Sequence, residues 1–175
     1  MNLTSAVVSH KSELSSPVVW AKGDSAASKN YWRQQDKEVL NKIEKYQGPS
    51  VLLPNNATIA STERGQLPLS SLLSKEAKTA QILPQLASSS LISLGQLCDD
   101  NCVILLHKKV LLAIKNKEIV LKGIRNPIDR LWDIPVCKDI ITEDNYPMPS
   151  IHPSIYATRK GNTVAHSNNK AIRKV

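Results

Sequence analysis

The sequence predicts a mainly-β domain, and three observations lead to that prediction. The core must be built from Leu, Ile and Val, because the chain has no Phe and only 4% aromatic residues. Branched aliphatic side chains favour strands. Short apolar runs separated by turn-forming residues recur at intervals of ~8 residues, which is typical of an all-β barrel or sandwich. With 175 residues, the chain is long enough for one domain with a modest core.

Each expected element follows from a local pattern. Pro54-Asn55-Asn56 lies between two apolar runs and predicts a β-hairpin, because Asn tolerates positive φ and Pro ends a ladder. Apolar positions among charges predict a short helix, or a loop, over 36–46, ending at Gly48-Pro49, and a brief helical turn over 75–80. The expected strands cover residues 18–20, 51–53, 57–60, 67–69, 82–84, 91–94, 103–106, 110–114, 119–121 (with Gly123 ending that series) and 130–135.

Composition divides the chain into three parts. Residues 1–16 are Ser-rich without an apolar period, and we expect a disordered arm there. Residues 17–136 carry the strand pattern and form the expected domain. Residues 137–175 have three prolines and no repeating apolar face, which indicates a disordered tail or linker.

The net charge of +8 is spread along the chain. Residues 17–136 hold 16 Lys/Arg and 11 Asp/Glu, and residues 137–175 hold 6 and 3. Such diffuse charge allows weak, non-specific contact with nucleic acid but reads no sequence, and a basic solvated surface explains it equally well. Three cysteines, no signal peptide and no membrane-length apolar run predict a cytoplasmic, possibly nuclear, protein that does not contact membranes.

Asp24 is the candidate catalytic residue. It follows a short strand and opens a loop of small and polar residues, Ser25-Ala26-Ala27-Ser28. An aspartic protease needs two carboxylates that share one proton, so a chain with one such loop must form a homodimer around a two-fold axis. Taken alone, Asp-Ser-Ala is a weak signal, and an ordinary polar turn is the simpler reading.

Four sequence segments that occur in a fixed order favour the catalytic interpretation of Asp24 over an ordinary turn. They are DSAASKNYWR at 24–33, VLLPNN at 51–56, SSLISLGQLCDD at 89–100, and the pair LKGIRN and LWDIP at 121–126 and 131–135. Together they resemble the aspartic-protease region of copia-type retrotransposon Gag-Pol polyproteins. The resemblance spans about 120 residues; its specificity lies in the order and spacing of the blocks.

The resemblance implies a small closed retropepsin-like (acid protease) barrel, active as a homodimer that cuts the element's own polyprotein. It implies that Asp24 is the catalytic carboxylate, that Ser25 supports it across the dimer, and that Pro54, Asn55 and Asn56 form a substrate-covering flap. Residues 91–95 would support the Asp loop from behind.

Two features depart from the family pattern. Ala26 stands where the family has Gly, and Lys22-Gly23 stands where an apolar strand residue is expected. An unpaired buried Lys is costly, and a Lys near Asp24 favours its ionised form. A catalytically inactive, truncated retroelement-derived protein therefore stays open as the alternative.

Other chemistry has weaker support. Cys98, Cys102 and His107 lack a fourth zinc ligand at the usual spacing, so buried thiols that act as small hydrophobic residues are the better reading. No metal and no cofactor is expected. The chain has no glycine-rich phosphate loop and no HExxH motif.

Overall fold

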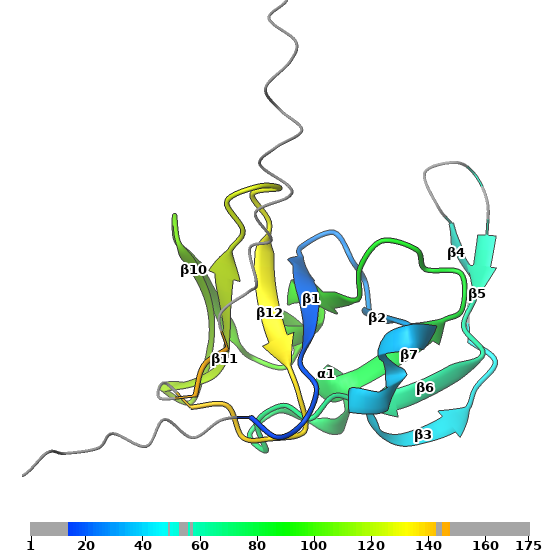
Figure 1. Ribbon diagram of the computed structural model, residues 1–175, viewed down its shortest axis with the longest axis horizontal. Coiled ribbons are helices and arrows are strands. Elements are labelled where there is room, and N and C mark those ends of the chain that lie inside the picture. Colours follow the sequence, from blue (N-terminus) through cyan, green and yellow to red (C-terminus); the bar gives the residue numbers. More distant parts are fainter. Residues whose placement is uncertain (1–13, 49, 53–55, 57, 143–144, 148–175) are drawn as a thin grey trace, which may run out of the picture.

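The computed structural model describes residues 14–48, 50–52, 56, 58–142 and 145–147. This part of the chain is mainly β, as the sequence predicts. Figure 1 shows β10, β11, β12 and β1 on one side of the molecule and β2, β7, β6 and β3 on the other, with the β4–β5 hairpin projecting beyond them. The strands are β1 (Val19–Asp24), β2 (Asn30–Arg33), β3 (Asn41–Lys45), β4 (Ser50–Leu52), β5 (Thr58–Ala60), β6 (Glu63–Gln66), β7 (Thr79–Leu83), β8 (Leu91–Ser93), β9 (Val103–Leu106), β10 (Val110–Lys115), β11 (Glu118–Arg125) and β12 (Trp132–Val136).

Ten strands form one sheet in the order β3-β6-β7-β2-β8-β1-β12-β11-β10-β9, and β4 pairs with β5 separately. Its two end strands, β3 and β9, do not pair with each other. The described sheet is therefore open, and the expected closure into a barrel is wrong, because closure requires the end strands to pair. In the end strand β3, Lys42 has a φ of 50° and the register with β6 shifts.

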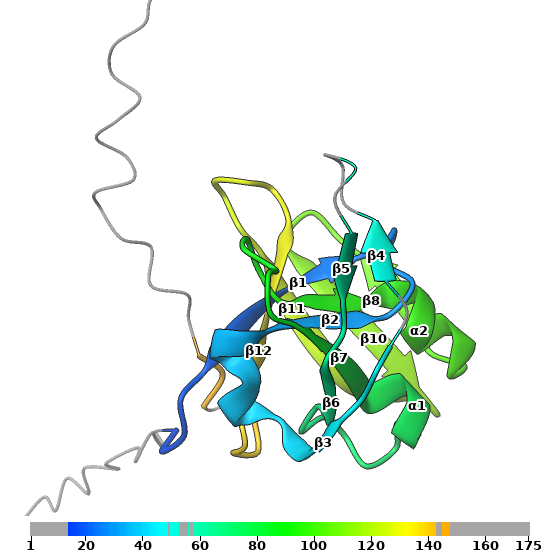
Figure 2. The same ribbon diagram turned by 90° about the vertical axis from the view of Figure 1, so that its right-hand side faces the viewer.

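Two parallel pairings bring distant segments together in the middle of the sheet. β8 lies between β1 and β2 and runs parallel to β1, while β2 runs parallel to β7. Figure 2 shows β1, β8 and β2 side by side. Strand β1 also pairs with β12 in antiparallel fashion, from Val19↔Val136 to Gly23↔Trp132. The strand that ends in Asp24 thus has a neighbour on both edges.

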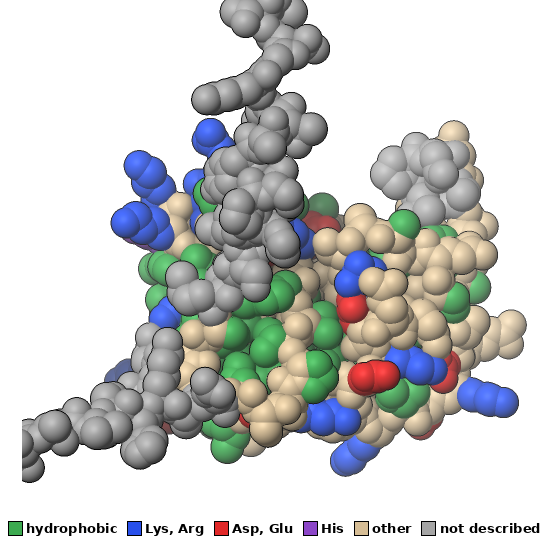
Figure 3. Space-filling view, viewed as in Figure 1, with side chains coloured by type: hydrophobic (Ala, Val, Ile, Leu, Met, Phe, Trp, Pro, Cys, Tyr) green, Lys and Arg blue, Asp and Glu red, His purple; other side chains and the backbone are tan. Residues whose placement is uncertain are grey.

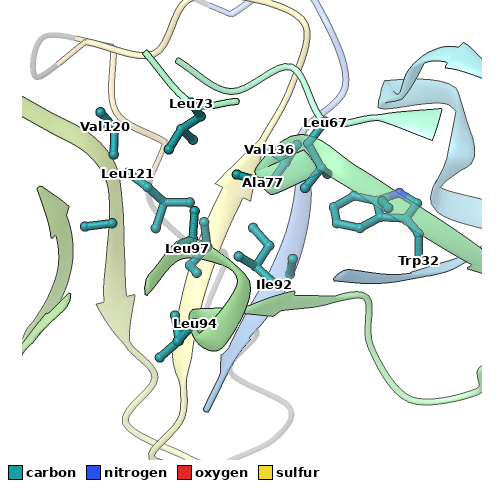
Figure 4. Close-up of a cluster of buried hydrophobic side chains, with 14 of the residues drawn as sticks. Trp32, Leu67, Leu73, Ala77, Ile92, Leu94, Leu97, Val120, Leu121 and Val136 are labelled. Atoms are coloured by element: carbon teal, nitrogen blue, oxygen red, sulfur yellow. The ribbon is translucent and has the colours of Figure 1, made fainter. Parts of the chain in front are cut away.

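The core is aliphatic around one buried indole. Trp32 is fully buried, and its Nε1 donates a hydrogen bond of 2.9 Å to the carbonyl of Asp36. Figure 4 shows Trp32 on one side of the cluster and the leucines of helix α2 (Leu94–Asp99) on the other. Since the sequence has no Phe, these branched side chains supply most of the buried apolar area.

Several local predictions are wrong in instructive ways. Residues 36–46 do not form one helix: the 3-10 turn η1 (Gln34–Val39) is followed by β3. Residues 67–69 are not a strand, since β6 ends just before them. Gly123 lies inside β11, where a Cβ would come within 3.0 Å of Ile134 Cγ1. The predicted hairpin, the turn at α1 (Lys75–Lys78) and the strands near 103, 110 and 132 are confirmed.

The described parts of the two flanking segments contact each other, and the C-terminal one also contacts the domain. The backbone N–H groups of Ser15 and Ser16 donate to Asp139 Oδ2 at 2.6 and 2.8 Å. The hydroxyl of Tyr146 donates to the carbonyl of Lys122 at 3.0 Å. These contacts fall inside the expected arm and tail; residues 1–13 and 148–175 lie outside the described residues.

An ion pair beside α2 predicts a dependence of stability on acid. Lys115 Nζ lies 2.8 Å from Asp100 Oδ2, which also accepts from the backbone N–H of Ser74 at 3.1 Å. Burial alone raises the pKa of Asp100, but the hydrogen bonds from Lys115 and Ser74 outweigh it and hold the pKa below its usual value of 3.8. A lowered carboxyl pKa contributes stability above the unfolded value and loses it as the pH falls through the folded value.

We therefore expect Asp100→Asn to lower the free energy of unfolding by about 1–2 kcal/mol at neutral pH. The difference from wild type should shrink as the pH falls below about 3.8. Urea denaturation at neutral pH and at a pH below about 3.8 measures this difference in the free energy of unfolding. A difference that stays constant into acid would contradict the prediction.

Candidate functional site

Asp24 is the last residue of β1, in the middle of the sheet. It stands opposite Ser93, the last residue of the parallel strand β8, so two strand ends meet at the start of the loop. The side chain of Asp24 is half-buried, and its Oδ1 accepts a hydrogen bond of 2.8 Å from the backbone N–H of Ala26. This contact folds the loop back on the carboxylate, as Asp does in turns.

Ser93 supports the loop from behind. Its hydroxyl donates to the carbonyl of Ala27 at 2.5 Å and accepts from the backbone N–H of Gln96 at 3.0 Å. The second contact is the N-cap of α2, since a Ser oxygen at this position satisfies a free helical N–H. One side chain therefore joins the Asp24 loop to the start of α2.

Asn30 ends the loop with a buried network. Its side-chain amide donates to the carbonyls of Ala77 and Thr79, both at 3.0 Å, and its Oδ1 accepts from the backbone N–H of Ser93 at 2.9 Å. Its own backbone N–H donates to Gln96 Oε1 at 2.9 Å. Asn30 is fully buried, so each of these groups would lose its partner without access to water.

Replacing Asn30 tests this network. We expect Asn30→Ala to lower the free energy of unfolding by about 2–3 kcal/mol, because the Ala77 carbonyl and the Ser93 N–H lose their buried partner, whereas the Thr79 carbonyl keeps Gln96 Nε2 at 3.2 Å. Chemical denaturation measures this loss, and hydrogen exchange at the amide of Ser93 should accelerate. An exposed neighbour change, Lys29→Ala, is the control and should alter stability by less than ~0.5 kcal/mol. Equal stability of Asn30→Ala and the control would refute the role assigned to Asn30.

The two residues after Asp24 are exposed. The hydroxyl of Ser25 hydrogen-bonds to no side chain or backbone group of the described residues, so its expected role across a dimer stays a prediction. Ala26 is described and does not have a positive φ, so its backbone conformation does not require Gly. Within one chain, Ala in place of Gly at this position causes no strain.

Lys22 has a different environment from the one expected. Its Nζ lies 2.5 Å from both Asp129 Oδ2 and Asp133 Oδ1, so it is neither unpaired nor directed at Asp24 by an ion pair. Burial lowers the pKa of Lys22, but hydrogen bonds to Asp129 and Asp133 outweigh it and raise the pKa above 10.5. Lys22 therefore does not interrupt the strand, and β1 is paired with β12 through residue 23.

Gly23 fits a close approach of neighbouring strands. A Cβ at this position would lie 3.0 Å from Leu111 Cδ1 and 3.2 Å from Ile134 Cδ1. Side chains of β10 and β12 therefore occupy the space that an apolar residue of β1 would fill. Contacts with β10, β12 and the turn before β12 therefore explain the two residues, Lys22 and Gly23, that differ from the family pattern.

The hairpin of β4 and β5 rises from the same end of the molecule as the loop after β1 (Figures 1 and 2). Its register runs from Ser50↔Ala60 to Leu52↔Thr58. Asn56 is exposed with a φ of 61°, which agrees with the tight turn predicted for this residue type. The other two residues of the expected flap, Pro54 and Asn55, lie outside the described residues.

Two cavities are described, and neither includes Asp24. One, of about 750 Å³, lies between Pro68–Ser71, β11, β12 and the segment after it, and includes the buried Cys137. Figure 3 shows hydrophobic side chains gathered over β11 and β12. The other, of about 270 Å³, is polar and reaches Lys29 in the loop after Asp24.

Metal chemistry has no geometric basis in the described part of the chain, where no three His, Cys, Asp or Glu side chains gather around a point. Burial raises the pKa of the Cys102 and Cys137 thiols, in keeping with their prediction as small apolar residues. Cys98 is exposed, so the prediction of burial is wrong for it.

Comparison with known proteins identifies no relative: no protein-family model, no curated protein and no solved structure matches the chain. Over the described residues, the helices are too short to cross a membrane.

Proposed function

We propose that the chain is a retropepsin-like aspartic endopeptidase of a retrotransposon polyprotein, working as a homodimer. The observation that carries the proposal is the pairing of Asp24 with Ser93 at the ends of two parallel strands, with Ser93 bonded to the loop at Ala27. A strand that ends in a carboxylate, supported from behind by a second strand and a short helix, is the arrangement that the resemblance implies.

The chemistry follows from two copies of this loop. Two Asp24 carboxyls brought close around a two-fold axis share one proton, since like charges at that distance cannot both ionise. The ionised carboxyl accepts a proton from water as the water attacks the peptide carbonyl, and the protonated one donates to the developing oxyanion. The hairpin, on the same end of the molecule, would cover the bound peptide.

The substrate in this proposal is the element's own polyprotein, processed in the cytoplasm or nucleus. Binding of nucleic acid through the net charge of +8 would be weak and sequence-independent. An inactive retroelement-derived protein is the second candidate. Ala26 favours it, because its exposed Cβ lies where a second loop would approach.

Cleavage by the unmodified chain tests the proposal. The protein is incubated with a peptide library at pH ~4–6, where one of two paired carboxyls is protonated. We expect cleavage whose specific rate falls on dilution, because only the dimer has two carboxyls. Ala26→Gly is tested in parallel. Cleavage by Ala26→Gly alone would support the inactive protein, and no cleavage by either would contradict the proposal.

A further inference from the structure

Strand β9 (Val103–Leu106) leaves one edge of the ten-stranded sheet open. It is the last strand in the order and pairs on one side with β10, through Leu105↔Leu112 and Val103↔Ile114. At the turn, the backbone N–H of His107 donates to the carbonyl of Val110 at 2.8 Å. Because backbone groups alternate in direction along a strand, those of Ile104 and Leu106 point away from β10.

The side chains along this edge are apolar and uncovered in the described chain. Val103, Leu105 and Leu106 are 66%, 47% and 49% exposed. The pairing register continues the apolar row from Val103 through Ile114 to Ile119, which is 58% exposed. Exposed edges normally carry charges, prolines or bulges that prevent pairing with another chain.

The opposite edge of the same sheet has those protections. Strand β3 reads Asn-Lys-Ile-Glu-Lys, and its register with β6 shifts between Asn41 and Glu44. Strand β9 reads Val-Ile-Leu-Leu and has no charge, proline or shift within it. The contrast indicates that β9 is kept apolar for an interaction.

Charges at the two ends of β9 point to its partner. Asp99 precedes the strand, and Lys108 and Lys109 follow it, and all three are exposed; Asp100 is already paired with Lys115. An antiparallel second copy puts the acidic end of one strand beside the basic end of the other, whereas a parallel copy would put like charges together. The edge is therefore complementary to itself in one orientation.

We propose that β9 is a self-association edge, at which a second copy of this chain adds antiparallel to form a two-fold continuous sheet. With the axis at Leu105, the outward backbone groups of Ile104 in one copy bond those of Leu106 in the other, and the reverse. The two Leu105 side chains then pack as a close cross-strand pair.

This contact is separate from the dimer proposed for Asp24. Four strand spacings separate β9 from β1 in the sheet order. The short strand limits the contact area, and we expect a dissociation constant on the order of 10–100 μM. Chains that make both the β9 contact and the Asp24 dimer contact would be linked into assemblies longer than a dimer.

Sedimentation velocity of the full chain over about 1–200 μM tests the proposal. We expect Leu105→Lys to weaken self-association by at least ~10-fold, because a charge is placed in the edge. Ile43→Lys, at an exposed aliphatic position of the protected edge strand β3, is the matched control and should associate as wild type does. Circular dichroism checks that both variants are folded.

Charge exchange supplies a second, orientation-specific measurement. Asp99→Lys and Lys109→Asp should each weaken association, and the double variant should restore it. A monomeric wild-type chain at the highest concentration, equal association of Leu105→Lys and wild type, or no restoration in the double variant would overturn the β9 contact. Peptide cleavage by Leu105→Lys is a separate readout: its presence or absence bears on the Asp24 dimer, and the association data alone bear on β9.

Discussion

Asp24→Asn is expected to lower kcat/KM for peptide cleavage by at least ~10³-fold, because an amide neither shares a proton nor accepts one from water. The side chain of Asp24 is half-buried and bonded to Ala26 N–H through Oδ1, a contact that an amide oxygen also makes. The loop should therefore keep its shape. Loss of activity then reports the chemistry and not the fold, and thermal unfolding within ~0.5 kcal/mol of wild type would verify this.

Glu118→Gln is the matched control for this experiment. Glu118 is an exposed carboxyl at the start of β11, which is separated from β1 by β12 in the sheet order. Its replacement removes one negative charge as Asp24→Asn does, and the cleavage rate should stay within about twofold of wild type. Cleavage that survives Asp24→Asn would mean that a contaminant or another group performs it.

Lys22→Met is expected to lower the free energy of unfolding by about 3 kcal/mol. Removal of the ammonium leaves the carboxylate of Asp133, 4% exposed, with Asn126 Nδ2 at 2.7 Å as its remaining side-chain donor. A buried charge without its counter-ion is costly, whereas Asp129 is exposed enough to be hydrated. Chemical denaturation at neutral pH measures the difference.

Removing the carboxylate of Asp133 together with the ammonium of Lys22 provides the control. Asp133→Asn combined with Lys22→Met removes both charges, and the double variant should be more stable than the sum of the single losses predicts. Lys45→Met, at an exposed position of β3, should change stability by less than ~0.5 kcal/mol. Additive losses in the double variant would show that Lys22 and Asp133 are not coupled.

Local patterns in the sequence were sufficient for most strands but not for the surroundings of Asp24. The alternation and turn signals after residue 100 predict β9, β10 and β12 closely, because hairpins are local. Helix α2 was missed, since it has only six residues and includes Gly95. The partners of Lys22, Asp129 and Asp133, were missed because they are more than 100 positions away in the sequence, with Asp129 at a separation of 107.

The same limit applies to the candidate site. The resemblance singled out Asp24 and the segment behind it, but no pattern indicates that Asn30 would bond Ser93 and Ala77 at once. This buried hydrogen-bond network depends on the parallel pairing of β1 with β8 and of β2 with β7. Residue types alone do not predict those pairings. Closure into a barrel was wrong for a related reason: the fate of edge strands depends on long-range pairing.

The position of β1 also determines when the loop after Asp24 can form during synthesis. Its two neighbours, β8 and β12, are far later in the chain, and β12 is the last strand among the described residues. A nascent chain that has produced Asp24 and the hairpin has neither the strand behind the loop nor Ser93 to bond it. The loop therefore has both neighbouring strands only once translation has passed residue 136, and under the proposed function no cleavage is expected before that point.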